Sequence, residues 1–485
     1  MISTCPTGRV LIIIINPITG INRIYIQHPF NQLKCSSMKK NNIYILSIAL
    51  FLIAVGGIII KYNIQQKEKE NKVYGLLDRV GPLANTAEWK DVKKRSDDLM
   101  AALKKDPTDT KSALRLAALF IQEARVTGNY VYYDMAAMKY VNNVLNIDSS
   151  DFNALVFKSL IYLSQHHFAD GLAVAHKAQQ VNPYNAYVYG LLVDGNVEMG
   201  YYDSAVVYAD RMVAIRPDLT SYSRISYLRE IFGDYKGSIN AMRMAVEAGG
   251  QGDEHTEWTR VQLASLYEKV GDFKSADTLY NTSLAYRPNY AYALAGLART
   301  AQAANDYNKA IAYMEKADSL VSDNSLKTEL VDMYRLAGET KKADALANEV
   351  IAELTKDAQA GNKDANIGHY ADKELAYAYL KVNDKDKALE HALLEYNRRP
   401  DNIDVNETVA WVYYNRGEYA KAVPYIKVAL KTNSKNPVLL SRAALIYYKA
   451  GDNPMAKAIL VKTTISNPYI DKSLQTETAA ILPKL

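Results

Sequence analysis

Cysteine is almost absent from this chain of 485 residues. Its two cysteines, Cys5 and Cys35, both precede Met38, so the sequence offers no disulfide after that point. More than 400 residues supply enough apolar core without such cross-links. The chain also lacks a Cys-x-x-Cys pair, a His-Glu-x-x-His helix and a Gly-x-x-x-x-Gly-Lys phosphate loop. The sequence therefore carries no signature of a thiol, zinc-protease or nucleotide site.

Histidine is scarce too, with seven in the chain, and three of them lie close together. His166 and His167 fall in a predicted turn between helices, and His176 has no acidic or thiol partner at ligand spacing. A metal site needs three or four converging ligands. We therefore expect these histidines to lie at the surface, and we expect neither a metal nor a cofactor.

No arrangement of residues points to catalysis. The glycine-rich run 249–252 follows a predicted helix and no strand, so it is interpreted as a loop insert rather than a nucleotide-binding turn. No set of serine, histidine and acid can be placed. We predict a protein that is not an enzyme and has no evident small-molecule substrate.

Most of the chain has little net charge. The first 63 residues hold six Lys or Arg and no acid, whereas the whole chain has 58 basic and 53 acidic residues. The remainder therefore has 52 basic against 53 acidic residues. Such a balance gives no electrostatic footprint for nucleic acid, and we expect none to bind.

A small residue recurs about every 34 positions over the last 320 residues, which is typical of stacked helical hairpins. A small side chain lets the two helices of a hairpin cross closely. The nine positions are Gly171, Ala205, Ser238, Ala276, Ala310, Ala343, Ala388, Ala422 and Ala456.

Five residues before most of these positions stands a residue that tolerates the left-handed backbone at the end of a helix. His166 is the one misfit in this series. The others are Gly200, Gly233, Gly271, Asn305, Gly338, Asn383, Gly417 and Gly451. Each unit is thus predicted to be a helix, a tight turn and a second helix.

The stretches Gly271–Ala276 and Gly417–Ala422, with these spacings, resemble the tetratricopeptide-repeat (TPR) family. The resemblance covers roughly residues 151–468. It implies an all-α, right-handed superhelical solenoid of stacked helix-turn-helix repeats, which completes its core only by stacking.

The ends and inserts of the array are assigned by their departure from the repeat. Residues 83–150 are interpreted as degenerate N-terminal helical repeats, and 469–485 as a C-terminal capping helix. The polar insert 357–368 is predicted to be a flexible loop. The unit 220–249, with three arginines, is either a specialised contact surface or a bend in the solenoid.

Residues 43–60 form an apolar run of eighteen positions without charge, long enough to approach the thickness of a bilayer. We interpret it as a transmembrane helix that acts as a signal anchor. A cleaved secretory signal is the alternative, although Ile58–Lys61 offers a poor cleavage site. Residues 61–82 then form a charged stalk or linker, and 1–37 form a disordered or mis-assigned extension before a start at Met38.

In TPR arrays the first helix of each repeat lines the concave face. The resemblance implies that this face binds partners, and mixed aromatic and cationic side chains are typical of interface hot spots. The alternative is that some of these side chains pack between repeats. The candidate residues are Tyr187, Tyr227, Trp258, Tyr292, Arg299, Arg335, Lys373, Tyr377, Lys381, Trp411, Tyr414, Asn415 and Tyr448.

The family's carboxylate clamp needs Lys and Asn at inner places of adjacent repeats, where this chain has Lys373 and Tyr377, then Glu407 and Trp411. Recognition of a partner's C-terminal carboxylate is therefore not expected.

Together these features predict a non-catalytic, membrane-tethered TPR scaffold that binds protein or peptide partners, themselves membrane-associated, in its concave groove. A role in assembling an envelope complex fits this arrangement. In a bacterium the short N-terminal arm would place the array on the outer, periplasmic face. The alternative is a processed, soluble exported TPR binding protein.

Overall fold

The computed structural model describes residues 12–16, 20–24, 40–362, 368–463 and 465–485. It divides into two compact units, Met1–Val73 and Tyr74–Leu485. In the first unit, β1 (Ile12–Asn16) and β2 (Gly20–Ile24) pair as an antiparallel hairpin. The rest of the extension predicted over residues 1–37 lies outside the described residues.

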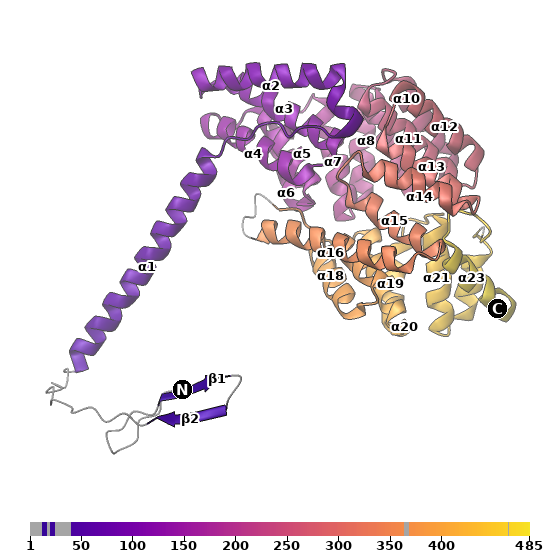
Figure 1. Cartoon of the computed structure of the whole chain (residues 1–485). Helices are drawn as coiled ribbons and strands as arrows, with labels where there is room; N and C mark the ends of the chain where they lie inside the picture. The colour runs from indigo at the N-terminus through magenta and orange to yellow at the C-terminus, as the bar shows by residue number, and fades with distance from the viewer. Residues whose placement is uncertain (1–11, 17–19, 25–39, 363–367, 464) are drawn as a thin grey trace. The chain divides into compact units, whose positions relative to one another are not determined.

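Helix α1 (Lys40–Asn71) is a single helix of 32 residues (Figure 1). Its segment Ser47–Ile64 is long and apolar enough to cross a membrane, and none of it is buried by the rest of the chain. Among the described residues it is the one helix that meets this test. A signal sequence near an N-terminus has the same length and composition, so α1 is a candidate span.

The described part of the second unit consists of helices and the short segments that connect them. Its helices are α2 (Ala87–Lys105), α3 (Thr110–Thr127), α4 (Tyr130–Ile147), α5 (Phe152–Ser164), α6 (Phe168–Val181), α7 (Ala186–Met199), α8 (Tyr202–Ile215), α9 (Leu219–Ile231), α10 (Tyr235–Glu247), α11 (Glu254–Lys269), α12 (Phe273–Tyr286), α13 (Ala291–Ala303), α14 (Tyr307–Asp318), α15 (Asn324–Leu336), α16 (Thr340–Asn362), α17 (Asp372–Lys381), α18 (Lys385–Arg398), α19 (Ile403–Asn415), α20 (Tyr419–Ala429), α21 (Pro437–Lys449), α22 (Asn453–Leu460) and α23 (Lys472–Ile481). Short 3-10 turns lie at Gly81–Asn85 and Leu482–Lys484.

Consecutive helices pair into hairpins, and the nine predicted units correspond to the pairs from α5–α6 to α21–α22. The predicted small residues lie on the second helix of each pair, and all nine are buried. A Cβ on Gly171, for example, would lie 2.8 Å from a methyl carbon of Leu163 on the facing helix. The small residues therefore set the close approach of the two helices, as predicted.

The predicted turns are confirmed by the backbone. Gly200, Asn305 and Asn383 all have positive φ, and so do the other glycines of the series. In several turns the next residue is an aspartate that caps the following helix; the Asp272 carboxylate accepts from the Ser275 amide at 3.0 Å. Each turn thus ends one helix and starts the next within a few residues.

One predicted loop is partly wrong. The insert expected to be a loop over 357–368 is helical up to Asn362, because α16 continues through it. The run Ala358-Gln359-Ala360 contains good helix formers and no proline, so the helix has no local reason to stop there. The remainder, residues 363–367, lies outside the described residues.

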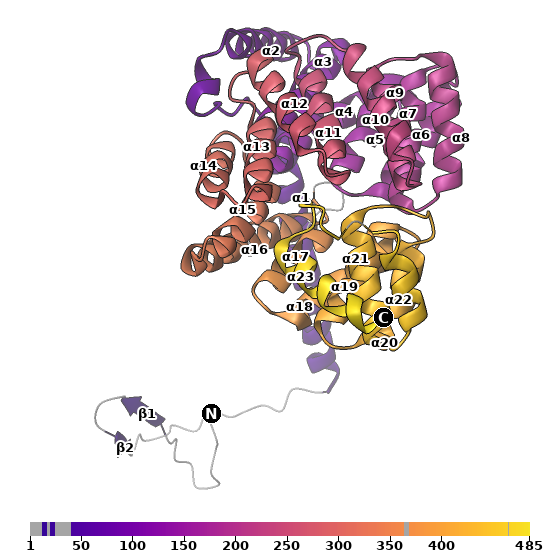
Figure 2. The ribbon, with the colours of Figure 1, turned by 90° about the vertical axis from the view of Figure 1, so that its right-hand side faces the viewer.

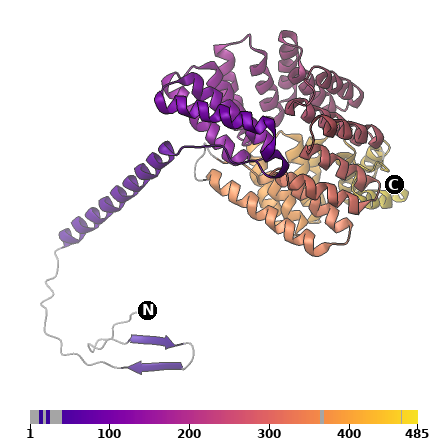
Figure 3. The same ribbon diagram turned by 45° about the horizontal axis from the view of Figure 1, so that its top comes forward.

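The solenoid coils tightly enough for its successive superhelical turns to touch. The His166 ring contacts the Tyr370 carbonyl, Arg399 contacts Glu198, and the Asn467 amide donates to the Lys269 carbonyl. These partners are 198 to 204 residues apart, which at about 34 residues per unit is about six units per turn. Figure 2 shows α21 and α22 below α6 and α8, and Figure 3 shows the orange hairpins beside the indigo ones.

Candidate functional site

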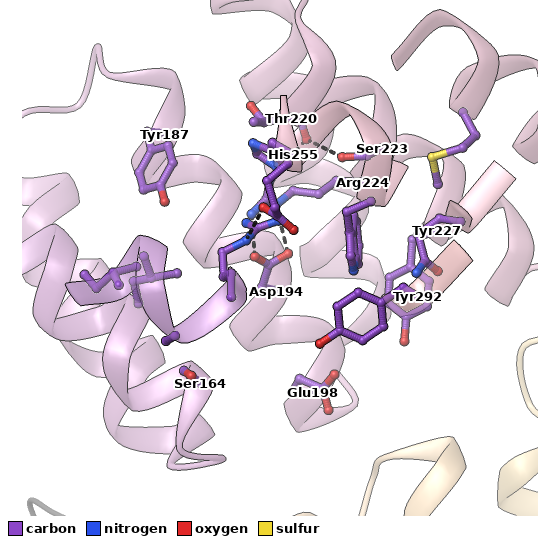
Figure 4. Close-up of a pocket in the computed structure, with 18 of the residues that line it drawn as sticks. Ser164, Tyr187, Asp194, Glu198, Thr220, Ser223, Arg224, Tyr227, His255 and Tyr292 are labelled. Carbon is purple, nitrogen blue, oxygen red and sulfur yellow. Dashed lines mark hydrogen bonds and ion pairs between the residues drawn. The ribbon is translucent and has the colours of Figure 1, made fainter. Parts of the chain in front are cut away.

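The concave side of the first superhelical turn contains an open cavity of about 850 Å³ (Figure 4). Its wall comes mainly from the first helices of successive hairpins, α3, α5, α7, α9 and α11, because these helices face inward. Four of the predicted concave residues line it: Tyr187, Tyr227, Trp258 and Tyr292. Tyr227 is 40% exposed, so its ring is available from the cavity side.

Arg224 of α9 is the central cation of the wall. Its Nε and Nη2 atoms donate to the Asp194 carboxylate at 2.8 and 2.6 Å, and Nε also lies 3.1 Å from the Gly190 carbonyl. A Cβ on Gly190 would come within 3.1 Å of the Arg224 guanidinium carbon. The absence of a side chain at Gly190 therefore gives the guanidinium room to lie flat between α7 and α9.

Other ionisable groups of the wall have shifted pKa values because they are removed from water. Burial, together with the nearby Arg125 and Arg224, lowers the pKa of His255 to about 4. Burial raises the pKa of Glu198 above its usual range, although Arg399 of the next superhelical turn forms an ion pair with it. The wall thus presents aromatic rings, a neutral imidazole and charges that are already paired.

Asp134 of α4 is buried in this wall, and burial raises its pKa to about 7, against the effect of a hydrogen bond with Ser164. In the unfolded chain an aspartate has a pKa of about 3.9, so the folded chain holds this proton more tightly. The destabilisation caused by this carboxyl is therefore absent below about pH 4 and grows as the pH rises to about 7.

We expect Asp134→Asn to leave the free energy of unfolding unchanged near pH 4 and to raise it at pH 8 by up to roughly 4 kcal/mol. This figure corresponds to a pKa difference of about three units between the folded and unfolded chains. Urea unfolding at several pH values, followed by circular dichroism, measures the difference. The exposed Asp210→Asn is the matched control and should give no such pH-dependent gain. A constant difference between Asp134→Asn and the native chain at all pH values would contradict the assignment.

The other nine predicted residues lie in the second half of the array, and most of them contact a neighbouring repeat. Arg299 donates to Glu268 at 3.0 Å, Glu329 at 3.2 Å and Tyr280 at 3.1 Å. Glu268 and Tyr280 belong to the hairpin before its own (α11–α12), and Glu329 belongs to the hairpin after it (α15–α16). Its charge is therefore used to join repeats.

The same holds for the remaining cations. Lys381 pairs with Asp332, and Arg335 contacts the Lys381 carbonyl. Lys373 is partly buried, and burial would lower its pKa, but the carboxylates Glu374, Asp404 and Glu198 raise it.

The aromatic residues of the last repeats are packed together. Trp411 and Tyr414 stack with ring centroids 4.8 Å apart, and the Arg442 guanidinium lies 4.8 Å from the Trp411 ring. Tyr414 is buried and donates to Glu477 of α23.

Tyr377, Asn415 and Tyr448 also contact neighbouring residues of the array. The Tyr377 hydroxyl accepts from Arg442 at 3.1 Å, and the Asn415 amide donates to the Trp411 carbonyl at 2.8 Å. Tyr448 packs against the core of the last hairpins. The contact of Tyr377 matches the alternative considered from the sequence, in which some of the predicted residues pack between repeats, whereas the Asn415 contact stays within α19.

Sequence reasoning missed most of the polar wall, notably Arg125, Asp134, Asp194 and His255. Arg224 was noticed only as part of the unusual unit 220–249. That unit contributes Thr220, Ser223 and Arg224 to the cavity. One signal in the sequence could have indicated this contact. Arg224 follows Gly190 by 34 residues, which is one repeat length, so the two residues occupy equivalent places in adjacent units.

The surface interpretation of the histidines His166 and His167 is wrong. His167 is 2% exposed, and His166 is partly buried against Tyr370 and His369 of the neighbouring superhelical turn. The turn that carries them is covered because the solenoid touches itself there, which the local sequence does not reveal.

Comparison with known proteins supports the repeat assignment. The family model described as "Tetratricopeptide repeat" matches residues 259–290 and 291–324, which correspond to most of α11–α12 and to α13–α14. The chain therefore contains tetratricopeptide repeats in this region, as the resemblance implied. No curated protein matches the chain.

Several solved structures of low sequence identity are similar to parts of this chain. The human IFIT1 dimer with m7Gppp-AAAA matches with a TM-score of 0.42 and 15% identity, covering 70% of this chain and 76% of that one. A tetratricopeptide repeat protein from Parabacteroides merdae ATCC 43184 matches with a TM-score of 0.39 and 14% identity, covering 51% of this chain and 93% of that one. The APC/C hetero-tetramer Cut9-Hcn1 matches with a TM-score of 0.39 and 13% identity, covering 73% of this chain and 58% of that one. This chain therefore spans little more than half the length of that one.

Proposed function

We propose that this chain, which carries tetratricopeptide repeats, is a non-catalytic scaffold that binds a segment of a protein partner in the cavity of its first superhelical turn. The observation that carries the proposal is the cavity itself. Its volume of about 850 Å³ lies within the range of ligand sites, roughly 300–1,000 Å³, and suits a short peptide segment rather than a whole folded surface.

The residues of the wall suit a peptide. Tyr187, Tyr227 and Trp258 offer rings that lose little conformational entropy on binding, and such residues dominate interface hot spots. Arg224 has backbone and carboxylate partners already in place, so it presents an ordered guanidinium edge without the entropy cost of fixing it. The binding role of the nine predicted residues in the later repeats stays a secondary part of the proposal.

We further propose that α1 tethers the array to a membrane through residues 43–60, with the array on the outer face in a bacterium. Tethering would raise the local concentration of the array around membrane-associated partners. Assembly of an envelope complex is the function that this combination favours.

Site-specific photocrosslinking in cells tests the binding site. A photoreactive amino acid placed at Tyr227 should yield a crosslink to one defined peptide segment of a partner, identified by mass spectrometry. Adding Trp258→Ala should reduce that crosslink, because loss of a hot-spot side chain costs about 2 kcal/mol or more, roughly thirtyfold in affinity. The same probe at Tyr184, which is 78% exposed and outside the cavity wall, is the control.

Equal crosslinking from positions 227 and 184 would contradict the cavity as the binding site. Alkaline extraction of membranes from the same cells tests the tether separately: the full chain should stay in the pellet. Release into the supernatant with a new N-terminus after residue 60 would instead favour the processed, soluble protein.

A further inference from the structure

Three potential metal ligands meet where two superhelical turns touch. They are His166, in the turn between α5 and α6, with His369 and Glu374 at the start of the α17 region. One ligand atom from each residue lies within 4.8 Å of the other two. About 200 residues separate the two segments, so the array itself brings this set together.

His166 has the left-handed backbone conformation that ends the first helix of each unit. Its φ is +62°, at the place where the other units have glycine or asparagine. Residues other than glycine are uncommon in this conformation, although asparagine, aspartate and histidine adopt it several times more often than the rest. A histidine is therefore compatible with this turn, and the turn holds its side chain where the two superhelical turns meet.

The side chains are oriented for a shared ligand. The Nδ1 atom of His166 lies 3.0 Å from the Tyr370 carbonyl, which leaves Nε2 free to bind an ion. His369 forms a hydrogen bond with the backbone of Ser164. Metal-binding histidines typically use their second nitrogen in this way, which fixes the ring and its tautomer.

One oxygen of the Glu374 carboxylate, Oε2, lacks a hydrogen-bond partner among the described residues. This atom is closed off from solvent. An unpaired carboxylate oxygen in such a place is costly and calls for a cation or a proton. Lys373 interacts with this carboxylate, but its charge is also shared with Asp404 and Glu198.

We propose that His166, His369 and Glu374 bind one divalent transition-metal ion of the zinc class. Two imidazoles and one carboxylate form a ligand set used for Zn²⁺, and a fourth position remains for water or another ligand. Three atoms spaced up to 4.8 Å apart need to move inward by less than about 1 Å each to reach bonding distances of about 2.1 Å. Such an ion would link the two superhelical turns directly.

This site was not predicted from the sequence, because His166, His167 and His176 offered no acidic partner within their own segment. The array supplies the missing ligands from a distant repeat. The inference is independent of the peptide cavity, although α5 carries both Ser164 of the cavity wall and the turn with His166.

Metal analysis of the tag-free, full-length chain in detergent tests the proposal. After chelation and incubation with ZnCl₂, gel filtration should recover about one zinc ion per chain, and CoCl₂ should give the visible absorption of a cobalt–imidazole site. His166→Gly restores the residue type of the other turns, so it should fold well yet bind zinc at least about 10-fold more weakly. Glu374→Gln, which keeps the shape of the side chain, should weaken binding as well.

His176→Ala removes a histidine that lies outside the cluster and is the matched control, expected to retain the zinc. Absence of zinc from the native chain after gel filtration would overturn the proposal. Equal zinc content in the native chain, His166→Gly and Glu374→Gln would also overturn it. Thermal unfolding with and without ZnCl₂ adds a second readout: the metal should raise Tm in the native chain and not in His166→Gly.

Discussion

Gly200→Ala is expected to destabilise the array by about 2–5 kcal/mol, although it adds a single methyl group. Gly200 ends α7 with φ of +84°, and a Cβ there would lie 2.3 Å from the carbonyl carbon and oxygen of Asp401. The obstacle is backbone of the next superhelical turn, which cannot rotate away as a flexible side chain would. The substitution therefore strains its own turn and also pushes two turns apart.

Gly417→Ala separates these two effects. Gly417 has φ of +78° but no atom within 4 Å of an added Cβ, so only the strain of its own turn applies, about 1–2 kcal/mol. Urea unfolding of both variants gives the stabilities, and small-angle X-ray scattering shows whether Gly200→Ala expands the array. Equal losses of stability and unchanged dimensions in both variants would show that the contact between superhelical turns does not contribute to stability.

Arg79→Ala is expected to cost about 3–5 kcal/mol, because it leaves a charged carboxylate buried without its partner. Arg79 lies in the segment that leads into α2, and its Nε and Nη2 atoms donate to Glu123 of α3 at 2.9 and 2.6 Å. Their side chains are 1% and 0% exposed. Trp89 lies close to Arg79, with 5.2 Å between its ring and the guanidinium carbon, so tryptophan fluorescence during urea unfolding reports on this region.

Two further variants make the test specific. The double variant Arg79→Met with Glu123→Leu should recover most of the loss, since apolar residues of similar volume often replace a buried ion pair without penalty. Lys93→Ala breaks the exposed Lys93–Asp78 pair and should cost no more than about 1 kcal/mol. If Arg79→Ala and Lys93→Ala had similar effects, the buried pair would not be a significant anchor of the N-terminal helices.

The repeat units were predictable because their signals are local. Ala276 must be small for its hairpin to close, and Gly271 with Asp272 must end one helix and cap the next. Each requirement acts within about ten residues, so it is visible as a spacing. His166 stood out from the same pattern, and the structure gives it the same positive φ as the glycines and asparagines.

The site was predictable only in part. Tyr187, Tyr227, Trp258 and Tyr292 follow from the inward face of the first helices, and they line the cavity. Arg299 occupies a corresponding place in its helix, yet it is held by Glu268 and Glu329. The position of a residue within its repeat predicts which way its side chain points. It does not predict whether that side chain meets an open cavity or a residue of a neighbouring repeat.

The sequence by itself determined the hairpins, their turns, their close helix crossings and the apolar segment before them, because short-range packing and backbone geometry decide these features. Only the tertiary structure decided that the solenoid closes on itself after about six units, as seen between Glu198 and Arg399. That closure depends on small rotations between repeats, which accumulate over about 200 residues and leave no spacing to detect. The cavity, the covered turn at His166 and its meeting with Glu374 all result from this accumulated geometry.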